Sequence, residues 1–93
     1  MNSLELQRDV LEAMPRLQLG MIYKLSIHAN KGTWRSSYPT LKDAYIKLLE
    51  EVGELNKAIV TGGNYAEIAD EASDISNMAM IIMHLKLLGV PNV

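Results

Sequence analysis

Apolar residues recur along this chain at helical intervals. Between residues 16 and 29, and again between 41 and 60, they return every three or four positions, which places them on one side of a helix. No segment alternates between apolar and polar residues over a useful length, as a half-buried strand would. The pattern therefore predicts an all-α protein.

The N-terminal part of the chain carries weaker boundary signals. Ser3 can cap a first helix that runs to about Ala13 or Met14, and Pro15 either kinks this helix or opens the next segment, 16–29. The stretch "NKGTWRSSYPT", residues 30–40, is dense in turn-forming residues and predicts a loop of about ten residues. Loops of that length are often functional.

Two long helices are predicted after this loop. Thr40 and Asp43 form a capping box that opens a helix ending at Thr61 and the two glycines after it. Asn64 can cap the last helix, which runs to about Leu88. We expect a bundle of three long helices plus a short N-terminal helical piece, in which the last two helices form a tight hairpin.

Composition narrows the class of protein. Its 93 residues suit a single domain, 1–93, and 48% of them are apolar. The net charge of -2 argues against nucleic-acid binding, and the absence of cysteine excludes disulfides and thiolate metal sites. The charged N-terminus does not resemble a signal peptide, and no apolar stretch is long enough for a membrane span. We expect a soluble, cytoplasmic protein.

"MAMIIM", residues 78–83, is apolar around the whole helix circumference. A helix of that kind is buried on every side, which three helices can hardly provide. The segment therefore favours a homo-oligomer, either a dimer or a tetramer.

Acidic residues flank the apolar stripes of the last two helices. On the earlier helix, Glu51 falls nearest the stripe, Glu54 lies about 60° further round, and Glu50 is furthest away. On the last helix Glu71 borders the stripe and Asp74 follows one turn later. The two pairs can face each other when the hairpin closes. The stripes themselves are predicted at Leu41, Tyr45, Leu48, Val52, Leu55 and Ile59, and at Ile68, Ala72, Ile75, Ala79 and Ile82.

Two interpretations of these acids remain open. They can be solvated helix faces, and Lys47 and Lys57 can then pair with the glutamates of the earlier helix. The last helix, however, holds like-charge pairs at i,i+4 and has no lysine or arginine before Lys86. A hard divalent cation such as Mg²⁺ or Mn²⁺ would relieve that repulsion.

The acidic motifs also carry a family resemblance. "EEVGE" at 50–54, followed after sixteen residues by "EASD" at 71–74, resembles the E-E-x-x-E and E-x-x-D signature of MazG-like nucleotide pyrophosphohydrolases, members of the all-α NTP pyrophosphatase superfamily. The resemblance implies hydrolysis of a nucleoside triphosphate to the monophosphate and pyrophosphate, in dimers or tetramers. It implies Mg²⁺, or Mn²⁺, held by Glu51, Glu54, Glu71 and Asp74. Glu50 would support these ligands or help to activate water, so that Glu50 and Glu51 are the catalytic candidates.

Other side chains are candidates for substrate binding. Asn77, one turn after Asp74, could donate to a phosphate or sugar, and Lys31 and Arg35 in the long loop could reach phosphates. Trp34 could stack on a base, although it could equally pack the loop onto the bundle. His28 is a further substrate candidate near a helix end.

Two alternatives compete with the pyrophosphohydrolase hypothesis. One is a phosphoribosyl-ATP pyrophosphohydrolase from the same superfamily. The other is a non-catalytic helical interaction module that uses its acids for solubility. The sequence does not distinguish nucleotide housecleaning from control of a nucleotide pool.

Overall fold

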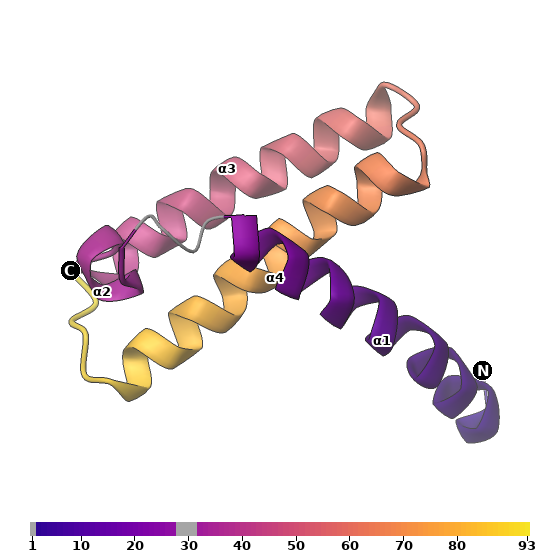
Figure 1. Ribbon diagram of the computed structural model, residues 1–93, viewed down its shortest axis with the longest axis horizontal. Coiled ribbons are helices and arrows are strands. Elements are labelled where there is room, and N and C mark those ends of the chain that lie inside the picture. The colour runs from indigo at the N-terminus through magenta and orange to yellow at the C-terminus, as the bar shows by residue number, and fades with distance from the viewer. Residues whose placement is uncertain (1, 28–31) are drawn as a thin grey trace.

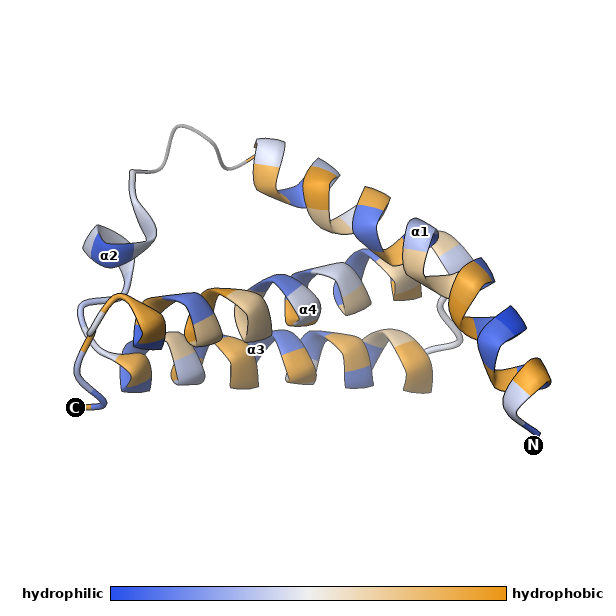
Figure 2. Cartoon of the chain, turned by 90° about the horizontal axis from the view of Figure 1, so that it is seen from below, coloured by the Kyte–Doolittle hydropathy of each residue, from blue (hydrophilic) through white to orange (hydrophobic). Residues whose placement is uncertain are grey.

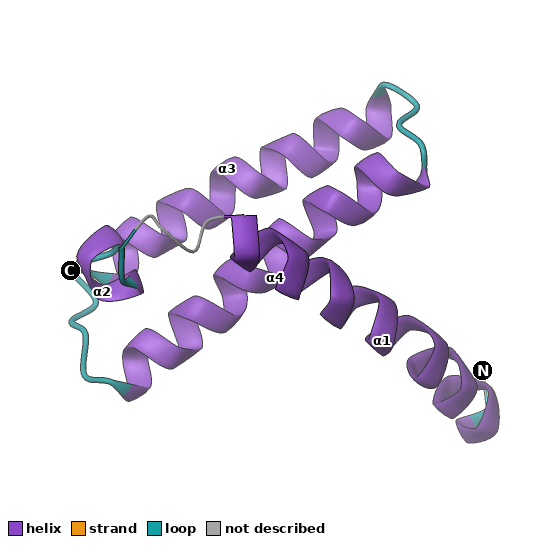
Figure 3. Ribbon diagram, in the orientation of Figure 1, coloured by secondary structure: helices purple, strands orange, loops and turns teal. Residues whose placement is uncertain are grey.

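The computed structural model describes residues 2–27 and 32–93, and these residues form four helices and no strand. The helices are α1 (Ser3–Ile27), α2 (Trp34–Ser37), α3 (Leu41–Val60) and α4 (Tyr65–Leu87) (Figure 1, Figure 3). The all-α prediction is confirmed over this part of the chain. His28 and Lys31 lie outside the described residues.

Helix α4 is the centre of the fold. Among the described helices, α1, α2 and α3 each contact α4 and do not contact one another (Figure 1). The buried apolar core is correspondingly small, and three of its five residues lie on α4. It consists of Ala44, Met78, Ile81, Leu85 and Val90.

The predicted apolar stripes are only partly correct. On α3, Leu41, Leu48 and Leu55 are half-buried as expected, but Tyr45, Val52 and Ile59 are exposed. On α4 the most buried positions are displaced from the predicted stripe, and Ala79 is exposed. The displacement arises because α4 packs against both α1 and α3, whereas a single apolar stripe buries a helix against one partner. The buried residues of α4 are Ser73, Asn77, Met78, Ile81 and Leu85.

Helix α1 continues through Pro15, so the predicted end at Ala13 or Met14 is wrong. Pro15 is exposed, and water can therefore satisfy the Leu11 carbonyl that the proline cannot bond. The half of α1 before Leu17 is exposed throughout and extends past the hairpin, with hydrophobic residues along it (Figure 2). The predicted loop 30–40 also contains the short helix α2, which Thr33 caps by accepting from the Ser36 amide.

The turn after α3 and the chain after α4 have the same hydrogen bonding. After α3, the Gly62 amide donates to the Ile59 carbonyl and the Gly63 amide to the Ala58 carbonyl, at 3.2 and 2.7 Å. Gly62 has φ of +76°, a left-handed conformation that glycine adopts without a steric penalty. Gly89, with φ of +85°, ends α4 in the same manner. The predicted helix ends are therefore confirmed.

The start of α3 is fixed by two sets of contacts. The predicted capping box is present, since the Thr40 hydroxyl accepts from the Asp43 amide while the Asp43 carboxylate accepts from the Thr40 amide. The next two amides, of Leu41 and Lys42, donate to the carbonyls of Pro91 and Asn92, both at 2.9 Å. The segment that follows α4 thus returns to the first turn of α3.

Helices α1 and α4 meet closely at Gly20. A Cβ built on Gly20 would overlap the hydroxyl of Ser73, which is itself buried and donates to the Ala69 carbonyl at 2.8 Å. The absence of a side chain at residue 20 therefore sets how near α1 lies to α4. Within the described residues, no helix is long and apolar enough to cross a membrane.

We predict that Gly20→Ala destabilises the protein despite the better helix propensity of alanine. Overpacking of this kind costs about 1–3 kcal/mol, and 1 kcal/mol lowers the Tm of a domain this size by about 4–8 °C. Thermal melts followed by circular dichroism test this prediction. Gln18→Ala, on an exposed position of the same helix, should leave Tm unchanged, and adding Ser73→Ala to Gly20→Ala should restore part of the loss. Equal Tm values for Gly20→Ala and Gln18→Ala would contradict it.

Candidate functional site

Three carboxylates converge where α3 and α4 face each other. One carboxylate oxygen each from Glu51, Glu71 and Asp74 lies within 4.8 Å of the others. Glu51 and Asp74 are largely shielded, with side chains 15% and 20% exposed. Glu51 belongs to the line of α3 that faces α4, and Glu71 and Asp74 are one turn apart on α4. The predicted pairing of acids across the hairpin is therefore present for these three residues.

Glu71 has the least favourable surroundings of the three. Burial raises the pKa of its carboxyl, and the charges of Asp74, Glu51, Glu54 and Asp70 raise that pKa further, in this order. No lysine or arginine among the described residues forms an ion pair with Glu71. The ionised cluster therefore opposes folding most strongly at this residue.

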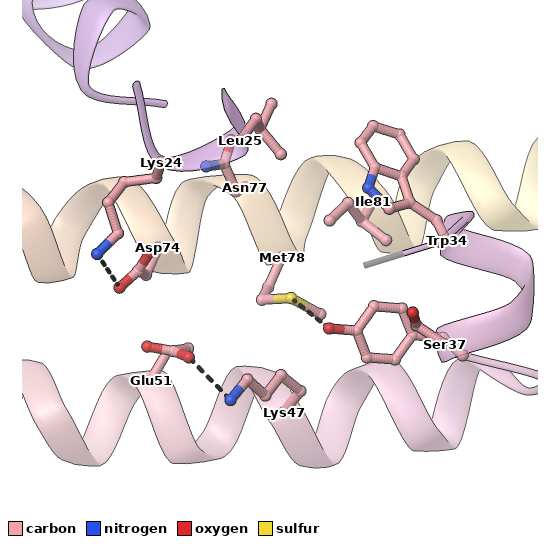
Figure 4. A pocket seen from close by; sticks show the side chains of 12 residues that line it. Lys24, Leu25, Trp34, Ser37, Lys47, Glu51, Asp74, Asn77, Met78 and Ile81 are labelled. Carbon is pink, nitrogen blue, oxygen red and sulfur yellow. Dashed lines mark hydrogen bonds and ion pairs between the residues drawn. The ribbon is translucent and has the colours of Figure 1, made fainter. Parts of the chain in front are cut away.

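Two lysines offset part of the negative charge. The Lys24 ammonium, from α1, lies 3.0 Å from an Asp70 oxygen and 3.3 Å from an Asp74 oxygen. The Lys47 ammonium lies 3.4 Å from both Glu50 and Glu51. Figure 4 shows Lys24 beside Asp74 and Lys47 beside Glu51.

Both lysines remain charged in this setting. Burial alone lowers the pKa of the Lys24 ammonium, but the hydrogen bonds and charges of Asp70 and Asp74 outweigh burial and raise it. The pKa of Lys47 is raised by the same balance, with Glu51 and Glu50 as the partners. The last helix thus obtains from α1 the cation that its own sequence lacks, and the repulsion between Asp70 and Asp74 is already compensated.

A pocket of about 370 Å³ adjoins these charges. Figure 4 shows the charged side chains at one end of the pocket and Trp34 at the other. The charged end holds Lys24, Lys47, Glu51 and Asp74, and Trp34 lies at the opposite end, while Tyr38 also lines the pocket. The pocket therefore has room for an elongated ligand with one charged and one planar end.

Asn77 lies in the wall of this pocket and is 5% exposed. Its side-chain amide donates to the Met21 carbonyl at 3.1 Å, which ties α4 to α1. Its oxygen is buried and has no partner. The sequence suggested that Asn77 donates a hydrogen bond to a phosphate or sugar, but its amide nitrogen already donates to Met21. The group without a partner is the oxygen, which can only accept, and it therefore suits a hydroxyl or amino donor.

The residues of α2 and Tyr38, its C-cap, contribute to the core packing, to the pocket or to both. Trp34 packs against the core and contacts His84 edge to face, with ring centroids 5.8 Å apart, and it also lines the pocket. The Tyr38 hydroxyl donates to the Met78 sulfur at 3.6 Å, and burial raises the pKa of this hydroxyl. Arg35 does not line the pocket; its guanidinium donates to the Leu88 carbonyl at the end of α4.

The remaining glutamates of the first motif lie apart from the cluster. Glu54 is exposed and is not among the three converging residues, although its charge reaches Glu71. Glu50 is exposed and paired with Lys47. Lys24 was not identified from the sequence, and neither was the position of Lys47 at the pocket. The only sequence signal for Lys24 is a lone cation on an otherwise apolar side of α1.

No protein-family model, curated protein or solved structure matches this chain. The MazG-like resemblance therefore rests on the two acidic motifs alone.

We predict that Glu71→Gln stabilises the metal-free protein, because it removes a carboxylate from a repulsive cluster. The folded-state pKa of Glu71 is raised, so its contribution to stability is present in acid and is lost as pH rises through that pKa. The gain in Tm should therefore appear near pH 7, at a few degrees, and vanish below about pH 4, where the native carboxyl is protonated.

Thermal melts in a chelator at both pH values test this expectation. Glu12→Gln, on the exposed half of α1, is the control and should change Tm at neither pH. A lower Tm for Glu71→Gln at pH 7 would show that the cluster is not repulsive.

Proposed function

We propose that the protein is a Mg²⁺-dependent pyrophosphohydrolase that converts nucleoside or deoxynucleoside triphosphates to the monophosphate and pyrophosphate. The observation that carries this proposal is the convergence of Glu51, Glu71 and Asp74, two of which, Glu51 and Asp74, line a pocket that Trp34 also lines. A triphosphate chelating a metal has one charged end, and a nucleobase is planar, so the two ends of the pocket match the two ends of the substrate.

The donor set fits a hard divalent cation. Three carboxylates offer only oxygen, which Mg²⁺ and Mn²⁺ prefer, and Mg²⁺ commonly completes its shell with water and substrate phosphates. Glu51, Glu71 and Asp74 would hold the ion, and exposed Glu54 lies one turn after Glu51. When bound, the ion supplies neutralisation of phosphate charge and activation of water.

The protein side chains would then bind and orient the substrate. Lys24 and Lys47 can donate to phosphate oxygens at the charged end, and Trp34 can stack on the base. The unpartnered oxygen of Asn77 can accept from a sugar hydroxyl or a base amino group. Glu50, exposed beside Glu51, can accept a proton from water that enters from solvent.

The activity is tested by incubating the protein with each of the eight common NTPs and dNTPs and Mg²⁺, then converting released pyrophosphate to phosphate for colorimetry. We expect at least one triphosphate to yield pyrophosphate. Glu51→Gln and Asp74→Asn should each reduce kcat by about 10²-fold or more, since each removes one charged ligand. The surface variant Glu12→Gln should retain full activity. No pyrophosphate from any substrate, or full activity in both site variants, would overturn the proposal.

An interaction module is the second candidate, and the large accessible surface of the single chain favours it. The chain has an accessible surface of 6740 Å². A compact monomer of 10.4 kDa exposes about 5,400 Å². The excess exceeds the ≈ 800 Å² that each partner buries in a typical interface. Metal titration separates this module from the enzyme, because a pure interaction module requires no carboxylate-dependent metal binding.

We further propose that a second copy of the chain covers the outer face of α3 in a homodimer or homotetramer. Tyr45, Leu49, Val52 and Ile59 follow one another there at spacings of four, three and seven residues, and all four are exposed. Gly53 lies beside this row, and a Cβ there would meet nothing within 4 Å in its own chain. A partner helix can therefore approach closely.

We predict that Leu49→Lys and Val52→Lys lower the oligomeric mass while preserving helicity. Both side chains are exposed, so a lysine does not disturb the core of one chain, but it would be buried in the interface. Light scattering should give a multiple of 10.4 kDa for the native protein and a smaller mass for both variants. Glu12→Lys, the same new side chain on an exposed position of α1, should leave the mass unchanged. Unchanged mass in both α3 variants would exclude this face.

A further inference from the structure

Lys24 is the one described cation that α1 inserts between the acids of α4. Its side chain is 16% exposed, against 45% for Lys47, and it pairs with two carboxylates of another helix, whereas Lys47 pairs with glutamates of its own helix. Asp74 belongs to the three-carboxylate cluster, whereas Asp70 does not. The ammonium therefore lies between a proposed metal ligand and a carboxylate outside the metal site.

We propose that Lys24 is a built-in counter-cation that competes with the divalent ion for Asp74. In the metal-free protein the ammonium neutralises Asp74 and Asp70 together. When a divalent ion binds Glu51, Glu71 and Asp74, the ammonium leaves Asp74 and keeps its pair with Asp70. This inference rests on the metal site of the proposed function and adds an element of control to it.

The competition follows from the geometry of the contacts. The ammonium lies 3.3 Å from one oxygen of Asp74 in a largely shielded position, so the ion pair is not averaged away by solvent. An ammonium and a divalent cation on the same carboxylate repel each other strongly at such a separation. Asp70, at 3.0 Å, gives the displaced ammonium a partner without any movement of α1.

This competition couples metal binding to the docking of α1 on α4. Helix α1 contacts only α4 among the described helices, and Lys24 supplies both of its ion pairs with that helix. If metal binding weakens one of these pairs, tighter docking of α1 must weaken metal binding to the same extent. Lys24 is thus a positioning residue for the metal site and is retained near the incoming phosphates.

The test is calorimetric titration of the full chain with MnCl₂ or MgCl₂, without nucleotide. Lys24→Met removes the competing charge and keeps the length of the side chain, so we expect the metal to bind about tenfold more tightly. Lys24→Arg keeps the charge and should bind the metal as the native protein does. Lys42→Met, nine residues before Glu51 on the same helix and exposed, controls for the loss of one positive charge. A merely structural role would give weaker binding in Lys24→Met, never tighter.

Each outcome decides the matter. Tighter binding in Lys24→Met alone supports the inference. Equal or weaker binding in Lys24→Met, with the native circular dichroism spectrum, overturns it while leaving the metal site in place. If Lys24→Met does not fold, Lys24→Gln is measured in its place with the same expectation. Absence of metal binding in the native protein and in every variant would overturn both this inference and the metal-dependent function.

Discussion

The structure depends on the need of α4 to pack against three helices at once. Its buried positions therefore extend beyond one apolar stripe and include Ser73 and Asn77, which lie where α1 crosses. Ser73 allows α1 to approach at Gly20, and Asn77 ties the Met21 carbonyl to α4. Because α4 is the common partner, any side chain at its flanks is brought close to a second element. That is why its acids meet Glu51 on one side and Lys24 on the other.

The same packing explains the uneven charge balance of the site. Asp70 and Asp74 have a counter-charge from α1, and Glu51 has one from its own helix, but Glu71 has none among the described residues. Because Glu71 lies near Glu51 and Asp74 without a cation of its own in the described part of the chain, the cluster has a deficit of positive charge at this residue. That local deficit is a sharper reason to expect a cation than the number of acids on α4, which the sequence emphasised.

The sequence could predict the features that depend on interactions between residues close together in the chain. The cap at Thr40 and the glycine after α3 are local signals, and both helix boundaries are confirmed. The meeting of Glu51 with Asp74 was also predictable, because a short turn joins their helices.

By contrast, the pairing of Lys24 with Asp70 spans 46 residues and depends on where α1 crosses α4, which no local pattern encodes. The apolar stripes were misplaced for the same reason. Glu54 was predicted for the site from the acidic motif, and Arg35 from its position in the predicted loop, but neither residue lines the pocket. The assignment to a family stays a prediction.

The distance along the chain between α1 and its partner α4 also affects the order in which the protein can fold. The ends of α3 and α4 are joined by a short turn on one side and by the Pro91 and Asn92 carbonyls on the other, so this hairpin can form from contacts within residues 40–92. Helix α1 is synthesised first, yet its only partner among the described helices is the last one made. Its apolar residues must therefore wait, solvent-exposed, until α4 emerges from the ribosome. The carboxylates of the hairpin likewise come together only once α4 has been made, when Lys24 is already present in the chain to neutralise Asp70 and Asp74.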